Sequence, residues 1–253
     1  VRLYTAPLNV GDQLRERFFP DLRSCVMTSA TLAVAGKFNY FLNRVGLTGS
    51  VSERVRTLEV GSPFDFDQQA FIAVPEWFPT PKSRDFQDAV TDLVRDLVVT
   101  TRRGALVLFT SYKMLNETYR AVQSDFHSHG ITLLKQDRAV SRSNLAESFR
   151  QDRESVLFGT ESFWQGVDVP GDALELLVIV RLPFAVPSEP LLVAQGEALR
   201  AAGKDPFLHM TVPEAAIRFR QGFGRLIRSK SDRGAVLILD TRVVKERFGR
   251  AFL

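Results

Sequence analysis

The stretches Ala-Leu-Val-Leu-Phe at Ala105–Phe109 and Leu-Leu-Val-Ile-Val at Leu176–Val180 are apolar at every position. A strand with one face in water alternates apolar and polar residues, whereas a strand buried on both faces reads as a continuous apolar run. Strands of the second kind occur mainly in parallel sheets that carry helices on both faces. These two stretches therefore predict two inner strands of a parallel sheet.

Further strand-like runs lie on both sides of these two stretches and alternate with helical patterns. The additional predicted strands are Ser24–Met27, Arg56–Val60, Ala70–Val74, Thr132–Lys135, Ser155–Gly159 and Ala235–Asp240. The predicted helices cover residues 86–98 after an N-cap at Ser83, Lys113–His129 before Gly130, and Arg142–Arg150. Alternation of this kind implies right-handed βαβ units. The predicted fold class is therefore α/β, with a mainly parallel sheet flanked by helices.

The composition is that of an ordinary globular protein, since the 253 residues are 45% hydrophobic and 25% charged. A formal net charge of +4 is compatible with a polyanionic partner but does not identify one. The chain starts at Val1 without an initiator Met, so we expect it to be a piece of a longer protein. No apolar run reaches the roughly 18 residues of a membrane span, so no membrane is expected as a partner.

Cysteine and histidine usage restricts the kinds of site that the chain can hold. Cys25 is the only cysteine, which excludes an intrachain disulfide and a four-cysteine metal site and fits a reducing, cytoplasmic setting. His127 and His129 are two residues apart at the end of a predicted helix, where such residues do not face one another. No metal site is therefore predicted within this chain.

A basic helix near the C-terminus carries the most informative pattern. Thr211–Glu214 has the form of a capping box with proline in the first turn, which predicts a helix that continues through Arg228. The residues Arg218, Gln221, Arg225 and Arg228 follow one another at intervals of three, four and three residues. Such intervals place side chains on one helix face. The guanidinium groups on this face would suit phosphate oxygens.

Two glycines interrupt the same predicted helix. Gly222 and Gly224 each cost roughly 1 kcal/mol relative to alanine in a helix interior. A helix that keeps them beside an arginine stripe is consistent with close approach of a ligand. The alternative is a solvated basic face whose glycines only permit packing.

Three polar loops follow predicted strands. The longest is Phe158–Gly171, which is rich in Gly, Thr, Ser and Asp and contains Trp164. The two shorter loops are Thr28–Leu32 and Phe109–Tyr112. Loops at the carboxyl ends of strands are where open α/β sheets bind ligands. The alternatives are an ordinary connection for the long loop and caps of the next helix for the two short ones.

In this order the segments resemble the second half of a superfamily 2 helicase of the DinG/XPD group. The stretch Thr28–Leu32 resembles motif III, Leu108–Tyr112 motif IV, Gly159–Gly171 motif V and Gln221–Arg228 motif VI. The stretch Arg181–Phe184 also matches the group, and the resemblance covers almost the whole chain. One departure is Gln165, which stands where many members carry Glu; Asp168 in the same motif is intact.

The resemblance implies a RecA-like lobe, an architecture of the P-loop NTPase type. Residues 1–35 would be the tail of a preceding lobe that carries motif III, and residues 36–253 would be the C-terminal lobe. The sequence contains no Gly-Lys-Ser/Thr and no Asp-Glu pair, so the phosphate loop and the Mg²⁺-binding motif are absent. In the group both belong to the first lobe. ATP with Mg²⁺ would therefore be shared with that lobe, and this chain alone is expected to be inactive.

The resemblance also assigns roles to individual residues. The expected catalytic residues are Arg225, Arg228 and Gln221, with both arginines reaching the γ-phosphate. The expected nucleotide-binding residues are Gly166, Asp168, Gly224, Ser29 and Thr31, of which the last two would link nucleotide state to the lobe interface. The expected contacts to single-stranded DNA are Ser111, Thr160 and Trp164.

The resemblance predicts the C-terminal motor lobe of an ATP-dependent DNA helicase. Such a lobe would couple ATP hydrolysis to 5′–3′ translocation on single-stranded DNA and to duplex unwinding, in DNA repair or replication. Its partners would be single-stranded DNA and the first lobe; an iron–sulfur or nuclease domain of the parent would lie outside this chain. The alternative is a non-catalytic nucleic-acid-binding or interaction module derived from a helicase lobe. An unrelated α/β metabolic enzyme would need a cofactor loop, and no G-x-G-x-x-G follows any predicted strand.

Overall fold

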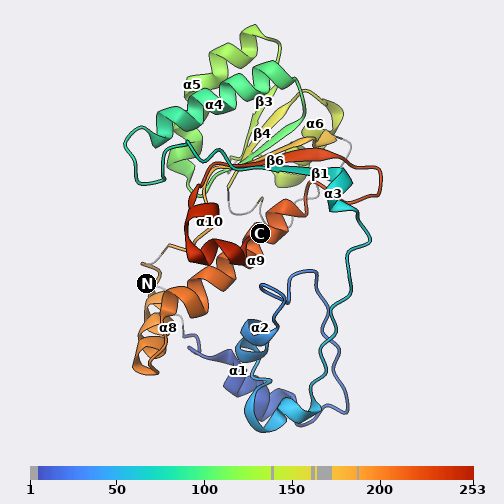
Figure 1. The fold of residues 1–253 in the computed structure, drawn as a ribbon, viewed down its shortest axis with the longest axis vertical. Coiled ribbons are helices and arrows are strands. Elements are labelled where there is room, and N and C mark those ends of the chain that lie inside the picture. Colours follow the sequence, from blue (N-terminus) through green and yellow to red (C-terminus); the bar gives the residue numbers. More distant parts are fainter. Residues whose placement is uncertain (1–4, 138–139, 161–162, 164–172, 187) are drawn as a thin grey trace. The chain divides into compact units, whose positions relative to one another are not determined.

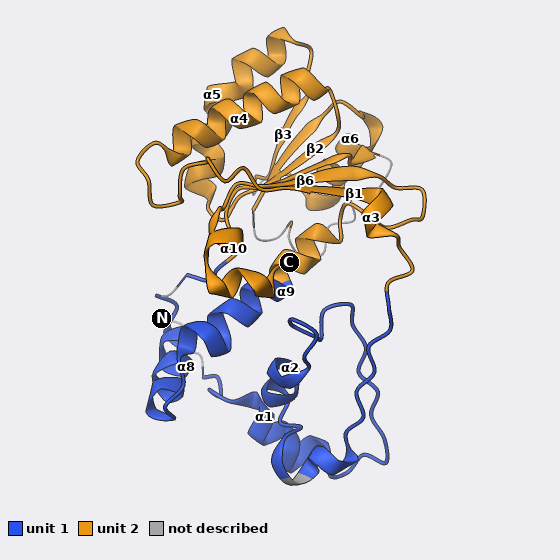
Figure 2. Cartoon of the chain, in the orientation of Figure 1, with its two compact units in different colours: residues 1–61, 184–217 blue, residues 62–183, 218–253 orange. Residues whose placement is uncertain are grey.

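The computed structural model of the chain describes residues 5–137, 140–160, 163, 173–186 and 188–253. The chain forms two compact units, which Figure 2 distinguishes by colour. One unit comprises residues 1–61 and 184–217, and the other comprises residues 62–183 and 218–253. Below, the first is called the helical unit and the second the sheet unit.

The sheet unit is built on a six-stranded parallel sheet (Figure 1). Its strands are β1 (Ala70–Ala73), β2 (Ala105–Leu108), β3 (Leu133–Lys135), β4 (Val156–Gly159), β5 (Leu176–Ile179) and β6 (Gly234–Ile238). Their spatial order is β1-β6-β5-β2-β4-β3, and every neighbouring pair is parallel. This arrangement confirms the predicted fold class.

The strands β2, β4 and β5 are buried at every position, as their continuous apolar sequences predict. Leu106 of β2 pairs with Leu157 on one side and with Leu177 on the other. Gly104 stands immediately before β2, where a Cβ atom would lie only 1.8 Å from the carbonyl oxygen of Ala173. A residue without a side chain is needed there for the strands to start at this spacing.

Helices cover the sheet. Among the described residues, the helices that lie wholly within the sheet unit are α3 (Phe66–Gln69), α4 (Phe86–Thr101), α5 (Tyr112–Ser128), α6 (Arg142–Gln151), α10 (Arg242–Lys245) and the 3₁₀ turn η5 (Arg247–Ala251). The helices α4 and α5 lie side by side over one face of the sheet (Figure 1). Their residues Val94 and Leu115 join Val107 and Phe158 of the strands in one buried apolar cluster. Burial of the apolar side chains that α4 and α5 turn toward the sheet is the main stabilising interaction of the two helices.

The structure confirms two of the predicted helix caps, at Ser111 and Gly130. Ser111 caps α5, since its Oγ accepts a hydrogen bond from the amide of Met114 at 3.3 Å. Gly130 follows α5 with a φ of +69°, which is the left-handed conformation that glycine adopts readily. The predicted cap at Ser83 is wrong, because α4 begins after Asp85 and Ser83 donates its hydroxyl hydrogen bond to that carboxylate instead.

The helical unit contains α1 (Val10–Gln13), the π turn η1 (Leu14–Phe18), α2 (Asn39–Arg44), the 3₁₀ turn η2 (Gly49–Arg54), α8 (Pro190–Ala201) and the π turn η4 (Phe207–Thr211). Two hydrogen bonds join its two chain segments. Gln195 donates from Nε2 to the carbonyl of Leu8 at 3.0 Å, and Tyr40 donates from its hydroxyl to Glu214 at 2.8 Å.

Among the residues that the structure describes, neither unit has a helix of the length and hydropathy that a membrane crossing requires.

Two predicted strands are wrong. The segments Ser24–Met27 and Arg56–Val60 form no strand. Val26, Leu58 and Val60 are 85%, 81% and 79% exposed. A strand exists only where a second backbone accepts and donates its ladder hydrogen bonds. The β-branched sequence of these segments favours an extended chain, but it does not supply that second backbone.

The predicted start of the basic helix is also wrong. The helix does not begin at Thr211, because the π turn η4 runs directly into α9 (Val212–Phe223). The chain enters this helix near Asp205, whose carboxylate accepts the amide of Phe207 at 2.8 Å. Pro213 has no N–H group and needs extra room on the preceding turn, and the widened π turn lies there. The boundary between the two units falls within α9, after Ile217.

The same helix ends five residues earlier than the spacing of its arginines predicts. The last α9 residue is Phe223. The amide of Gly224 still bonds to the carbonyl of Arg220 at 2.9 Å, but the amide of Arg225 bonds to Gly222 at 3.1 Å, three residues back. The chain thus tightens and leaves the helix. Leu226, which follows, is fully buried. Its packing in the core stabilises the chain here in place of further helical hydrogen bonds.

Candidate functional site

Four neighbouring strands end at one edge of the sheet and place polar residues there. The strands β4, β2, β5 and β6 are adjacent in that order and all parallel. Thr160, Ser111, Arg181 and Asp240 follow their carboxyl ends. In open parallel sheets this edge is where ligands bind. The edge is therefore the first part of the candidate site.

Thr160 is held inside the protein at this edge. Its residue is only 4% exposed. Its amide and its hydroxyl both donate to Oε1 of Gln136, at 2.7 Å and 3.0 Å, and Gln136 donates from Nε2 to the hydroxyl of Tyr112 at 2.7 Å. Gln136 thus joins the end of β4 to the start of α5. Sequence reasoning missed Gln136, although an amide directly after the predicted strand Thr132–Lys135 is a detectable signal.

Ser111 lies in a different environment. It is exposed, and its Oγ accepts the amide of Met114 as the cap of α5. A hydroxyl that accepts one hydrogen bond still has its own O–H to donate. Ser111 can therefore cap a helix and contact a ligand at the same time.

Asp240 is fully buried at the end of β6 and organises this edge. Its Oδ2 accepts the amide of Leu182 at 3.0 Å and Nη2 of Arg242 at 2.6 Å, and its Oδ1 accepts Nε of Arg242 at 2.8 Å. These hydrogen bonds raise the pKa of Arg242. The carboxylate therefore ties the chain after β5 to the chain after β6. Sequence reasoning missed this role of Asp240.

Arg181 projects from the end of β5 into a half-buried position. Its guanidinium lies 4.8 Å from the ring centroid of Phe86, and Nη2 donates to the carbonyl of Pro81 at 3.0 Å. Burial lowers its pKa, while Asp240 opposes this effect. The buried Nε has no hydrogen-bond partner among the described residues. The group remains a cation, since arginine keeps its proton in proteins.

The second part of the candidate site is the segment that leaves α9, here called the α9 exit and comprising residues 224–229. Arg225 and Arg228 are both half-buried, and burial lowers the pKa of each. For Arg228 the nearby carboxylate of Asp232 opposes the shift. The predicted single helix face that carries both arginines is therefore not formed, because Arg225 and Arg228 lie beyond the end of α9.

Gln221 stands on the last turn of α9, just before the exit. Its side-chain Oε1 is buried, and no described residue donates a hydrogen bond to it. A buried acceptor without a donor is uncommon in native proteins and often marks the place of a water or ligand. Gly224 is exposed, and the nearest atom to a Cβ built there is the carbonyl oxygen of Arg220 at 3.4 Å. A Cβ atom at Gly224 would therefore be in van der Waals contact with the preceding turn, and the residue itself is open to solvent.

The chain makes a turn after Arg228, and the carboxylate of Asp232 accepts the hydrogen bonds of this turn. Asp232 is 6% exposed. One carboxylate oxygen accepts the amides of Arg228 and Ser229, both at 2.8 Å, and the other accepts the Ser229 hydroxyl at 2.5 Å. Burial opposes ionisation of this carboxylate, but the hydrogen bonds and the charge of Arg228 outweigh burial and lower its pKa. Sequence reasoning missed Asp232, whose only local signal is a polar turn before a strand.

The remaining predicted residues belong to the helical unit or lie outside the described residues. Ser29 and Thr31 belong to the helical unit, where the two hydroxyls lie 3.3 Å apart and the amide of Thr31 donates to Ser29 Oγ at 3.2 Å. Trp164, Gly166 and Asp168 lie outside the described residues. Their roles stay predictions.

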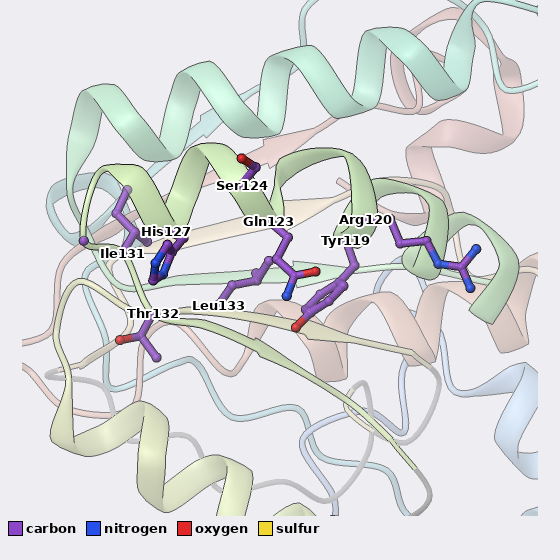
Figure 3. A pocket seen from close by; sticks show the side chains of 9 residues that line it. Tyr119, Arg120, Gln123, Ser124, His127, Ile131, Thr132 and Leu133 are labelled. Carbon is purple, nitrogen blue, oxygen red and sulfur yellow. The ribbon is translucent and has the colours of Figure 1, made fainter.

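Two hollows lie elsewhere in the chain. One, of about 780 Å³, runs along α5 and β3, and Figure 3 shows Tyr119, Gln123 and His127 on its wall. The other, of about 460 Å³, lies within the helical unit and is lined by residues that include Tyr40 and His209. Neither contains a sequence-predicted site residue. In the described part of the chain, no group of three or more His, Cys, Asp or Glu residues is arranged to hold a metal ion.

Comparison with known proteins agrees with the resemblance seen in the motifs. The chain is 37% identical over its whole length to the 3′-5′ exonuclease DinG of Bacillus subtilis and covers 27% of that protein. It is 36% identical over 99% of its length to the ATP-dependent DNA helicase YoaA of Haemophilus influenzae and covers 38% of it. The chain thus spans well under half of the curated relatives that it matches.

Solved structures of XPD helicases share the fold. The structure of Xpd4 from S. tokodaii matches 72% of this chain and 36% of its own with a TM-score of 0.53 at 19% identity. A second XPD helicase matches 72% of this chain and 33% of its own with a TM-score of 0.56 at 15% identity. This likeness confirms the predicted RecA-like helicase lobe. The model of the helicase C-terminal domain matches residues 94–253, and the chain therefore belongs to that helicase family.

Proposed function

We propose that this chain is the C-terminal motor lobe of an ATP-dependent DNA helicase. In the longer protein it would couple ATP hydrolysis to 5′–3′ translocation on single-stranded DNA and to duplex unwinding, in DNA repair or replication. The observation that carries the proposal is the α9 exit, where Arg225 and Arg228 are half-buried and follow Gln221, whose side-chain oxygen is buried, within seven residues of sequence. Residues 1–35 would belong to the preceding lobe. That lobe and single-stranded DNA would be the two partners of this chain.

The residues of the α9 exit fit the phosphates of a nucleotide. Guanidinium groups present paired donors that match phosphate oxygens, and partial burial strengthens their electrostatic effect. Phosphoryl transfer is catalysed mainly by positioning and by stabilising charge, which are the tasks that two fixed cations can perform. We assign this role to Arg225 and Arg228. Gln221 would orient water or a phosphate, and the exposed Gly224 would lie against the nucleotide.

The rest of the nucleotide site would be shared. Bound ATP with Mg²⁺ supplies the free energy of the cycle, and the residues that hold Mg²⁺ would come from the first lobe. Gly166 and Asp168 would contribute to nucleotide binding from this lobe. Ser29 and Thr31 would transmit nucleotide state to the lobe interface.

For single-stranded DNA we propose Ser111 as the first phosphate contact, because its exposed hydroxyl has a donor available. Thr160 is a second candidate, although its hydroxyl donates to Gln136 in the present structure and would have to exchange that partner. Trp164 would stack on a base. The chain has a formal net charge of +4, so it would attract the phosphates of single-stranded DNA. Its affinity for DNA would therefore fall as the salt concentration rises.

The test is the DNA-stimulated ATPase of the longer protein that contains this chain. Arg225→Ala and Arg228→Ala should each lower turnover by roughly 10³-fold or more, as loss of an arginine finger does. Arg120→Ala, at an exposed arginine on α5, is the matched control and should keep full turnover. If both exit variants keep their ATPase while DNA still binds, the chain is a non-catalytic binding module instead. Unwinding of substrates with either a 5′ or a 3′ single-stranded tail tests the polarity.

A further inference from the structure

The turn that carries Arg228 is held by a side chain rather than by a helix. Beyond Phe223 the chain has left α9, so the amides of Arg228 and Ser229 have no helical acceptor. Both donate instead to one oxygen of Asp232, at 2.8 Å each. A charged acceptor shared by two consecutive amides fixes the peptide between them in one orientation. The backbone at Arg228 is therefore set by Asp232.

A second side chain is hydrogen-bonded to the same turn. Gln69 is 5% exposed and lies at the end of α3, next to β1. Its Nε2 donates to the carbonyl of Ser229 and to the carbonyl of Asp232, at 2.9 Å each, and its Oε1 accepts the amide of Asp65 at 3.0 Å. Gln69 therefore connects this turn to the edge of the sheet.

The start of β6 fixes the far end of the turn. A Cβ atom on Gly234 would lie 2.6 Å from the carbonyl oxygen of Glu175 and 2.6 Å from the side chain of Leu226. Leu226 and Ile227 are 0% and 3% exposed. These buried side chains anchor the segment to the core, so its presence in the fold does not depend on Asp232. What Asp232 and Gln69 add is the direction in which Arg228 leaves the backbone.

We infer that Asp232 and Gln69 are positioning residues for Arg228, holding its backbone so that the guanidinium meets the nucleotide phosphate in the reactive geometry. The inference rests on the proposed function, because Arg228 has a phosphate to reach only if the chain is a motor lobe. A long arginine side chain keeps a defined reach only if its backbone and surrounding residues are rigid. A displacement of about 1 Å can cost about 10²-fold in rate.

The experiment is a double-mutant cycle in the longer protein, with Asp232→Ala and Arg228→Ala alone and together. Asp232→Ala should lower kcat for ATP by about 10²-fold, with a much smaller change in KM. In the Arg228→Ala background the same substitution should cost nothing further in kcat, because it acts through Arg228. Asp232→Asn keeps a carbonyl oxygen for both amides and should restore kcat to within a few-fold. Gln69→Ala should lower kcat in the same coupled way, whereas the exposed neighbour Gln68→Ala should not.

Each outcome separates the inference from the proposed function. If Arg228→Ala leaves ATPase intact, the proposed function fails. If Arg228→Ala removes ATPase but Asp232→Ala costs the same factor in both backgrounds, or leaves kcat unchanged, the positioning role is wrong. Thermal melts of all variants report stability separately, so that a loss of kcat is not confused with a loss of folded protein. If Asp232→Ala does not fold, Gln69→Ala carries the same cycle.

Discussion

Replacing Asp240 by alanine should destabilise the sheet unit more than any substitution at an exposed carboxylate. The carboxylate is fully buried at the end of β6 and accepts the amide of Leu182 and two guanidinium nitrogens of Arg242. Alanine removes every one of these acceptors. The Leu182 amide is then left buried without an acceptor, and the partly exposed Arg242 loses its counter-charge.

The size of the effect follows from these contacts. A buried donor left without a partner costs about 1–3 kcal/mol. Breaking a fully buried ion pair costs about 3–5 kcal/mol, but the Arg242 side chain is 30% exposed and can turn partly to water, so its share is smaller. We expect a total of roughly 3–4 kcal/mol. For a domain of this size the melting temperature then falls by about 10 °C.

Thermal unfolding of the chain, followed by circular dichroism, measures this shift. Asp240→Asn keeps one carbonyl acceptor for Leu182 and should lie between the wild-type and the alanine variant. Asp88→Ala removes an exposed carboxylate from the first turn of α4 and is the control, with an expected loss below about 1 kcal/mol. If Asp240→Ala melts within about 2 °C of the wild-type chain, the buried hydrogen bonds of Asp240 do not stabilise the sheet unit as proposed.

Three further predictions concern the α9 exit and DNA. Arg228→Ala should shift the melting temperature of this chain by only about 2 °C, because the hydrogen bonds to Asp232 come from backbone amides; a loss several times larger would make the side chain structural. Because the pKa of Asp232 is lowered from 3.8, its stabilisation is present above that value and is lost as pH falls through the folded-state pKa. Acid titration of Asp232→Asn should therefore show a shallower loss of stability below about pH 4, and identical acid profiles would contradict this. The chain alone should bind single-stranded DNA weakly, and anisotropy at about 50 mM and about 200 mM salt should show the affinity falling; binding that ignores salt would argue against phosphate contacts.

Local sequence was sufficient for the sheet and for the family. A strand buried on both faces needs apolar residues at every position, so Ala105–Phe109 and Leu176–Val180 marked inner strands without any knowledge of their neighbours. The order of the polar segments along the chain was sufficient to indicate a helicase C-terminal lobe, and the family match over residues 94–253 confirms it.

Local sequence was insufficient wherever a partner distant in the chain decides the structure. Ser24–Met27 and Arg56–Val60 carry strand-like residues but have no ladder partner, so they form no strand. The spacing of Arg218, Gln221, Arg225 and Arg228 is compatible with a helix throughout, yet burial of Leu226 draws the chain out of the helix after Phe223.

The geometry around Arg228 could be known only from the tertiary structure. Gln69 and Asp232 are 163 residues apart in sequence and meet in a buried hydrogen bond. Neither residue belongs to a recognisable motif, because an amide or a carboxylate acquires its role from the donors and acceptors that folding brings to it. Sequence alone predicted the arginines as phosphate-binding groups, since the chemistry of a guanidinium is intrinsic. Their placement depends on long-range hydrogen bonds and packing, which no local pattern encodes.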